Sequence, residues 1–318
     1  DRDAARPLLA FQLPLLPGSL ANFVAAQVER VLVRFQLGLE QVGILEMGYK
    51  FPILLTMLFV EPFMRSWAPE QIKVADEENG PKRIGDMFLY FLWLLLLFYL
   101  VLSINIESIL RILTPPEFWL AFFIARIEAV QLVIKALPRH LGFGLVYAKR
   151  AKDISKIMAT VAVIKIVLSY VLITNFGIYG AAWSTLIATI ITASWTSILA
   201  WRFYKLRVSL PRLATIVGAA VAINVAAVVV PRETVAEWGA PAIAFLQSGV
   251  NALAGTPIGA WRDGKIIELL GDRTPEVFDV MVRSAMVLPF VFVGPLIHRP
   301  TRLRVLGLLR RARLRVSH

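Results

Sequence analysis

The chain of 318 residues is 58% hydrophobic, contains no cysteine and carries a formal net charge of +12. Its mean hydropathy of +0.68 and its apolar runs of about 20 residues predict a polytopic α-helical membrane protein. The lack of cysteine excludes disulfides and thiol chemistry. Because the basic residues lie mainly between apolar runs, the charge indicates membrane topology rather than nucleic-acid binding.

About eight segments are long and apolar enough to be transmembrane helices. They are residues 8–36, 42–63, 85–110, 117–138, 154–174, 178–201, 211–230 and 277–297. Most lysines and arginines fall on one side of this arrangement, so the positive-inside rule places both termini in the cytoplasm. The polar segment 64–84 is expected to be a solvated inner loop.

The first of these spans carries costly polar side chains. They are Asn22, Gln27, Glu29, Arg30 and Arg34. A cation at bilayer depth costs at least about 2.5–3.5 kcal/mol, so such residues usually face a bundle interior or a wet cavity. Gln27, Arg30 and Arg34 share one helix face, and the other two form a neighbouring polar line. We expect this polar stripe to face a cavity.

The fourth span has a second polar stripe. Glu128, Gln131, Lys135 and Arg139 are spaced by three, four and four residues, so they line one side of a helix. Pro138 is expected to kink this helix near its inner end, because proline lacks the N–H that a helix needs. We expect the first three residues of the stripe to line the same cavity.

Other charges lie inside the predicted spans or near their ends. Glu46 and Lys50 stand four residues apart and are expected to pair locally, whereas Lys165, in mid-span, needs a carboxylate, backbone carbonyls or water. These three residues are candidates for coupling or ion pairing. Glu107 and Arg283 lie near span ends, where their side chains can snorkel. For the charges within spans, an internal ion pair that joins helices and a solvated pathway both remain open.

Patterns typical of enzymes are missing from the sequence. The three histidines are scattered at loop or tail positions, and neither GxxxxGK[ST] nor GxGxxG occurs. No Ser/His/Asp set is indicated by placement. We therefore expect no catalytic residue, no bound metal and no cofactor.

The C-terminal part contains the long outer loop 231–276 and the basic tail 298–318. Within the loop, residues 240–255 are apolar but short for a span, which favours an interfacial helix or a covered segment. Trp238 and Trp261 suit the headgroup level. The tail alternates arginine with leucine and is interpreted either as an amphipathic helix on anionic lipid or as a topology signal.

Four stretches, in matching order and spacing, resemble one family. They are LPLLPGSLANFVAAQVERVLVRFQLGLEQVGILEMGYKFP (13–52), ILRILTPPEFWLA (109–121), GLVYAKRAK (144–152) and TNFGIYGAAWSTLIATI (174–190). They are similar to bacterial polysaccharide flippases of the O-antigen type, which belong to the MATE-like multidrug/oligosaccharidyl-lipid/polysaccharide exporter superfamily. The resemblance covers about residues 8–207.

The resemblance implies two six-helix lobes related by pseudo-twofold symmetry, often followed by two extra helices. Residues 1–207 then correspond to the C-terminal lobe, and residues 208–318 to the added pair with its loop and tail. The N-terminal lobe would be missing from this chain, in agreement with its start at Asp1 rather than Met. Its natural partner would be that lobe.

The implied function is to move a lipid-linked oligosaccharide across the bacterial cytoplasmic membrane for surface polysaccharide biosynthesis. The substrate would be an undecaprenyl-pyrophosphate-linked glycan, with polysaccharide assembly proteins as further partners and no nucleic acid. Family cavities carry cations on the seventh span, and Arg30 and Arg34 match in position. The chain departs from the family pattern at Lys165 and Ser169, where the fifth span often has two asparagines, and in its more charged fourth span.

Three alternatives remain open. A drug or cation antiporter of the same superfamily needs an acidic membrane site, for which Glu29 and Glu128 are the candidates. An integral-membrane glycan polymerase or ligase would be expected to place arginines and acids in a long outer loop, such as 231–276. A non-transporting scaffold is the third possibility.

Overall fold

The computed structural model describes residues 10–229 and 274–297, together with residues 241, 244 and 248, and these are helical apart from short turns and the connection 202–209. Five helical stretches within that part are long and apolar enough to cross a membrane. They are Leu39–Ala75, Gly80–Leu113, Ala151–Phe176, Ile178–Trp201 and Leu210–Val229. The predicted all-α membrane fold is therefore confirmed. The expected interfacial segment 240–255 falls mostly, and Trp238, Trp261 and the tail 298–318 fall entirely, outside the described residues.

The remaining three predicted spans are also helical. They correspond to α2 (Leu16–Leu37), α6 (Ala121–Ala136) and the pair α14 (Thr274–Ala285) and α15 (Leu288–Ile297). The last span is divided because Pro289 cannot donate a backbone hydrogen bond and its ring would clash with the carbonyl of Ala285. The apolar runs in the sequence thus predicted these helices, and Pro289 explains why the last one is interrupted.

The prediction of a solvated inner loop over residues 64–84 is wrong in part. The helix α3 (Leu39–Leu55) continues through one π-helical turn, Thr56–Val60, into α4 (Glu61–Ala75), so the chain stays helical to residue 75. Pro62, at the start of α4, cannot donate to the turn before it, and the helix widens there rather than ending. Only a short turn then leads to α5 (Gly80–Leu113).

Contacts divide the chain into two units. The first contains residues 1–99 and 123–214, and the second contains residues 100–122 and 215–318. The helix α5 passes from one unit into the other. The domain boundary at residue 207 that the sequence indicated stays a prediction.

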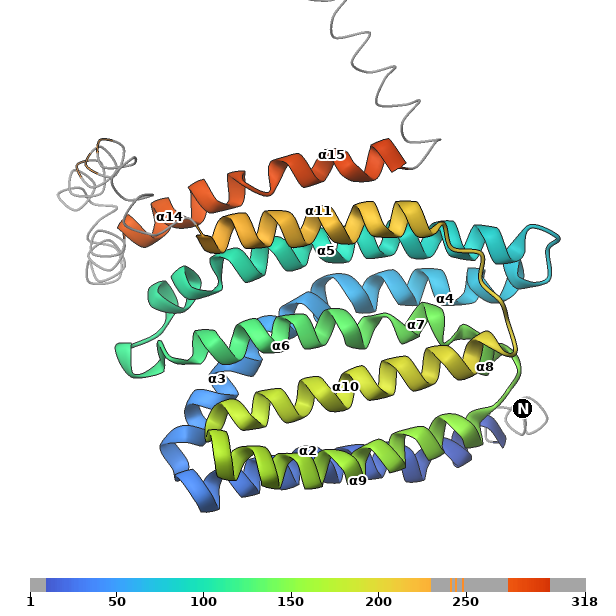
Figure 1. The fold of residues 1–318 in the computed structure, drawn as a ribbon, viewed down its shortest axis with the longest axis horizontal. Coiled ribbons are helices and arrows are strands. Elements are labelled where there is room, and N and C mark those ends of the chain that lie inside the picture. Colours follow the sequence, from blue (N-terminus) through green and yellow to red (C-terminus); the bar gives the residue numbers. More distant parts are fainter. Residues whose placement is uncertain (1–9, 230–240, 242–243, 245–247, 249–273, 298–318) are drawn as a thin grey trace, which may run out of the picture. The chain divides into compact units, whose positions relative to one another are not determined.

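In the first unit, α2, α9 (Ala151–Phe176) and α10 (Ile178–Trp201) pack side by side (Figure 1). A Cβ at Gly18 would lie 2.7 Å from the backbone oxygen of Ser155, so only glycine permits this approach of α2 to α9. The Gly18 N–H also donates to Ser155 Oγ at 3.0 Å. Gly177, with φ of +61°, makes the tight turn between α9 and α10.

The inner end of the fourth span is broken as Pro138 predicted. The helix α6 ends at Ala136, and α7 (Pro138–Leu141) starts at the proline itself. His140 on α7 is fully buried against the rings of Phe63, Phe88 and Phe91. This burial lowers the pKa of His140 to about 4, so the imidazole is neutral at physiological pH. The short helix α7 is thus fixed by aromatic packing.

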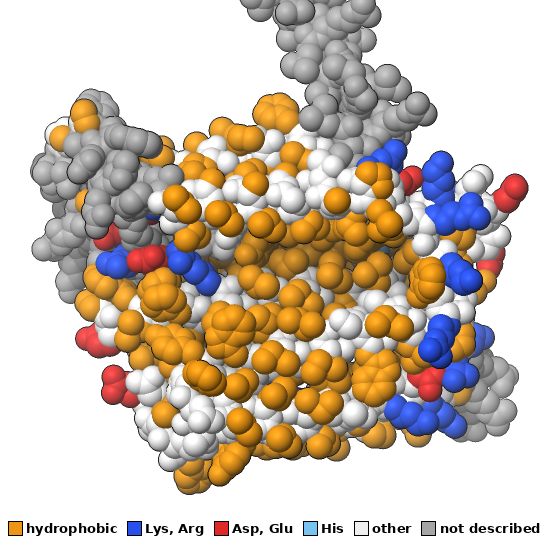
Figure 2. Space-filling model, in the orientation of Figure 1, with side chains coloured by type: hydrophobic (Ala, Val, Ile, Leu, Met, Phe, Trp, Pro, Cys, Tyr) orange, Lys and Arg blue, Asp and Glu red, His pale blue; other side chains and the backbone are white. Residues whose placement is uncertain are grey.

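One face of the first unit is largely apolar. Hydrophobic side chains cover the visible face of α6 and α10, and Lys and Arg gather near α8 (Phe143–Tyr147) (Figure 2). Large apolar side chains such as Trp195 and Ile198 are exposed, at 42% and 64%. Exposed apolar surface on this scale is expected where a helix contacts lipid.

The second unit has its own polar contacts. Arg283 on α14 is 5% exposed and forms an ion pair with Asp279 at 2.6 Å, which corrects the expectation that Arg283 snorkels. Its guanidinium also donates to the carbonyl of Ala227 on α11 (Leu210–Val229) at 2.7 Å, and Ser108 on α5 donates to Asp279. Glu107 pairs with Arg111 one turn away. Three helices are thus joined by one buried polar cluster.

Candidate functional site: a polar cavity in the first unit

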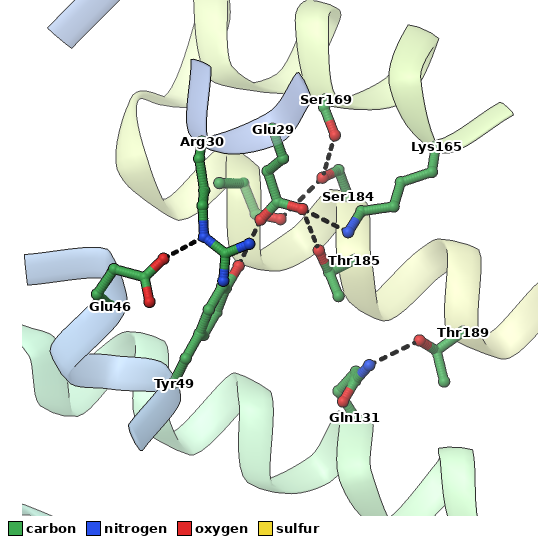
Figure 3. A network of polar contacts seen from close by, with 11 residues as sticks. Glu29, Arg30, Glu46, Tyr49, Gln131, Lys165, Ser169, Ser184, Thr185 and Thr189 are labelled. Atoms are coloured by element: carbon green, nitrogen blue, oxygen red, sulfur yellow. Dashed lines mark hydrogen bonds and ion pairs between the residues drawn. The ribbon is translucent and has the colours of Figure 1, made fainter. Parts of the chain in front are cut away.

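The centre of the site is Glu29, whose side chain is almost completely buried on α2. Its carboxylate accepts hydrogen bonds from Tyr49 Oη on α3 at 2.5 Å and from Thr185 Oγ1 on α10 at 2.9 Å, and it pairs with Lys165 Nζ on α9 at 2.5 Å (Figure 3). Four helices therefore converge on one carboxylate. Because both oxygens have partners, the charge of Glu29 is compensated inside the protein.

The carboxylate that Lys165 was expected to need is therefore Glu29. Beside this pair, Ser169 and Ser184 share a hydrogen bond of 2.9 Å between α9 and α10, and both are fully buried (Figure 3). The Lys165 and Ser169 positions, where the sequence departs from the family pattern, thus lie in the same polar cluster. They join α9 to its neighbours.

Arg30 adjoins this cluster and has a different partner. Its Nε forms an ion pair with Glu46 on α3, and both side chains remain more than a third exposed. The local Glu46–Lys50 pair is thus replaced by a pair between two helices, and Lys50 is exposed. The sequence could not show this, because Arg30 and Glu46 lie on different helices.

Two neighbouring cavities open beside these residues. The larger, of about 430 Å³, is lined by polar residues from α2, α3, α6, α9 and α10. The smaller, of about 370 Å³, is lined by residues from α2, α3, α4, α6 and α7 and from the π-helical turn. Arg30, Tyr49, Glu128 and Lys135 line both, so the two cavities share a polar wall.

The predicted stripe on the fourth span reaches this wall. Glu128 and Lys135 line both cavities, and Gln131 lines the larger one, where it donates to Thr189 on α10 at 2.9 Å (Figure 3). One oxygen of Glu128 is buried without a hydrogen-bond partner. Lys135 is exposed to the cavity and forms no ion pair within the described part of the chain.

The face that α2 turns toward the larger cavity differs from the predicted one. Asn22, Glu29 and Arg30 line the cavity, whereas Gln27 and Arg34 are exposed and line neither cavity. Successive residues of an α-helix are about 100° apart around its axis, so the cavity face of α2 is centred between Glu29 and Arg30. Gln27 and Arg34 lie roughly a quarter turn or more from that centre. A cavity role for Gln27 and Arg34 stays a prediction.

Seven further polar residues in the cavity walls were missing from the candidate set. They are Tyr49, Thr56, Glu61, Arg139, Thr185, Thr189 and Thr192. Arg139 belongs to the predicted stripe, and its spacing could have included it. Tyr49 and Thr185 gave no signal, because a single hydroxyl in an apolar helix is common and its partner Glu29 is far away in sequence.

Charge in these cavities is nearly balanced. The smaller cavity holds three cations, Arg30, Lys135 and Arg139, against the carboxylates of Glu61 and Glu128. Arg139 is paired with Glu61 at 2.6 Å. Among the described residues, no group of three His, Asp or Glu side chains could hold a metal ion. Lys135 and the guanidinium N–H groups of Arg30 and Arg139 that their ion pairs do not use are the donors that an anion could reach here.

The chain matches no protein-family model and none of the curated proteins. Two solved structures resemble it. One is an outward-facing multidrug resistance MATE family transporter of the MOP superfamily, at 17% identity and a TM-score of 0.45. The other is a MOP superfamily transporter from Pyrococcus furiosus, with a binding pocket described as having reverse polarity, at 17% identity and a TM-score of 0.44. Each alignment covers 95% of this chain and 70% of the other.

Proposed function

We propose that this chain takes part in moving a lipid-linked oligosaccharide across the bacterial cytoplasmic membrane, for surface polysaccharide biosynthesis. The observation that carries the proposal is the cavity of about 370 Å³ with Arg30, Lys135 and Arg139 in its wall, within a unit that exposes many large apolar side chains. Cations in such a cavity suit a pyrophosphate group, since one guanidinium group can donate two parallel hydrogen bonds to the oxygens of a phosphate. The resemblance of residues 13–52 and 174–190 to polysaccharide flippases supports the same substrate class.

The chemistry of the substrate fits the surroundings of the cavity. A glycan requires hydrogen-bonding groups, and the larger cavity offers Asn22, Gln131, Thr189 and Thr192. The lipid tail requires an apolar surface, which the exposed side chains of the helices provide. In this proposal the headgroup enters the polar cavities while the tail remains in the bilayer.

An antiporter of drugs or cations is the second candidate. Its support is the buried, unpartnered oxygen of Glu128 in the cavity wall. The other acidic candidate, Glu29, already has Tyr49, Thr185 and Lys165 as partners, so a cation would have to displace Lys165. The smaller cavity has three cations against two carboxylates, and this excess of one positive charge favours an anionic substrate over a cationic one.

Deletion of the gene in its own host tests the proposal. We expect lipid-linked oligosaccharide to accumulate in the cytoplasmic leaflet and surface polysaccharide to fall, with recovery when the gene is supplied again. The measurements are extraction of the lipid-linked intermediates and staining of the surface glycan. Normal glycan together with increased sensitivity to cationic dyes would contradict the proposal and favour the antiporter.

A further inference from the structure

The ion pair between Glu61 and Arg139 joins two elements at the wall of the smaller cavity. Arg139 Nη2 lies 2.6 Å from Glu61 Oε1, although the residues are 78 positions apart. Glu61 belongs to α4 and Arg139 to α7, and both line the cavity. The pair therefore connects two separate walls of one space.

Each partner follows an interruption of its helix. Glu61 comes directly after the π-helical turn Thr56–Val60, and Arg139 follows Pro138 at the start of a four-residue helix. A π-turn and a proline both interrupt the regular i→i−4 hydrogen bonds of a helix. The packing of His140 holds α7 in place, so an adjustment at the π-helical turn before Glu61 is the movement that would separate the two side chains.

The pair is also accessible to a competing anion. The side chains of Arg139 and Glu61 are 35% and 38% exposed. Ion pairs of this exposure contribute little to stability, because water already solvates both partners. A phosphate group carries more charge than one carboxylate and can accept two parallel hydrogen bonds from a guanidinium.

A second cation is available on the same wall. Lys135 lies one helical turn before Arg139 in sequence, lines the same cavity and has no ion-pair partner within residues 10–229 and 274–297. Together the two side chains supply an exchangeable guanidinium and an ammonium that shares the cavity wall with the carboxylate of Glu128 and forms no ion pair among the described residues. This combination is suited to an anion with more than one negative charge.

We propose that Arg139 and Lys135 form a binding site for a phosphate or pyrophosphate group, and that Glu61 occupies Arg139 until the anion displaces it. The choice of a lipid-linked pyrophosphate as its natural source rests on the proposed function. Glu61 then has two roles. It keeps Arg139 compensated in the empty cavity, and it is released from α7 when the headgroup binds.

Binding measurements on the purified chain in detergent test the proposal, because it predicts opposite changes in affinity for two substitutions. The probes are inorganic pyrophosphate and undecaprenyl pyrophosphate, titrated by calorimetry. In Arg139→Gln we expect binding to weaken about tenfold or more, because a hydrogen bond to a charged group is lost. In Glu61→Gln we expect binding to tighten about two- to fivefold, because the competing carboxylate is gone.

Matched controls separate local from general effects. Lys156→Gln removes an exposed cation, and Glu40→Gln removes an exposed carboxylate, both at positions that line neither cavity. Both controls should bind the probes as the parent chain does. Thermal unfolding of every variant checks that the fold is kept, and Arg139→Lys serves as a variant that retains the charge if Arg139→Gln fails to fold.

The outcomes are distinct. Opposite effects of Glu61→Gln and Arg139→Gln support the site, whereas weaker binding in both would show that the pair only joins the helices and would overturn it. Binding of inorganic pyrophosphate with no gain from the lipid would contradict the lipid-linked source. If the opposite effects occur but deletion of the gene leaves surface glycan normal, the anion site stands and the proposed function fails.

Discussion

The two units use the same arginine–carboxylate chemistry in opposite surroundings. In the first unit, Arg30 and Arg139 pair with acids at the wall of a cavity, and their side chains are 38% and 35% exposed. In the second unit, the Arg283–Asp279 pair is 6% and 11% exposed and has further partners in Ser108 and the carbonyl of Ala227. One set of pairs is accessible to solvent or ligand, and the other is enclosed.

This difference indicates different roles. An enclosed pair that loses one partner leaves a buried charge without compensation, so it strongly constrains the helices around it. An accessible pair can change partners at little cost, because water or a ligand replaces the lost contact. Substitutions of equal chemistry should therefore have unequal effects in the two units.

The largest effect is expected at Arg283. The substitution Arg283→Met should lower the free energy of unfolding by about 3–5 kcal/mol, because the buried Asp279 loses its ion pair with Arg283. Chemical unfolding in detergent measures the change. The double variant Arg283→Met/Asp279→Leu is the control and should recover much of the loss. If the single variant is as stable as the parent, the enclosed pair does not join these helices.

An intermediate effect is expected at Glu29, which lies in the cavity unit but is itself buried. The substitution Glu29→Gln should cost roughly 1–3 kcal/mol, because Tyr49 and Thr185 donate to different oxygens of Glu29 and Gln keeps only one of these oxygens, and because Lys165 loses its counterion. The same unfolding measurement applies. The double variant Glu29→Gln/Lys165→Met should be more stable than Glu29→Gln alone, and a further loss would contradict the assigned pairing.

The smallest effect on stability is expected at Arg30. The substitution Arg30→Gln should change the free energy of unfolding by only about 0.2–1 kcal/mol, because the Arg30–Glu46 pair is more than a third exposed. The same substitution should weaken pyrophosphate binding measurably, since Arg30 lines both cavities. Arg34→Gln is the matched control and should leave binding unchanged, because Arg34 lines neither cavity. If Arg34→Gln weakens binding more than Arg30→Gln does, the cavity face of α2 is the one predicted from the sequence, which includes Arg34.

Much of the helical framework could be predicted from the sequence, because an apolar run of about 20 residues has few other stable conformations in a membrane. The predicted break at Pro138 follows from the missing N–H in the same way. The extension of α4 to residue 75 could not be predicted, since the polar composition of residues 64–75 suits a solvated loop as well as an exposed helix.

The candidate site was predictable only in part. Glu29, Arg30, Glu128 and Lys135 were recognised because charges are costly inside a span, and all four line the larger cavity. Tyr49 and Thr185 were missed because no local pattern distinguishes them from ordinary helix residues. The pairing of Glu46 with Arg30 rather than Lys50 was missed because a local spacing rule gives no information about neighbouring helices.

By itself the sequence determined that the chain is helical, apolar and able to cross a membrane, and which charges would require compensation inside it. Only the tertiary structure decided which partner each charge has and whether that partner is enclosed or accessible. The physical reason is that helix formation and lipid exposure depend on composition and short-range periodicity. An ion pair such as Lys165–Glu29 depends instead on the rotation and approach of two helices, and residues such as Gly18 and Ser155 fix these through close packing.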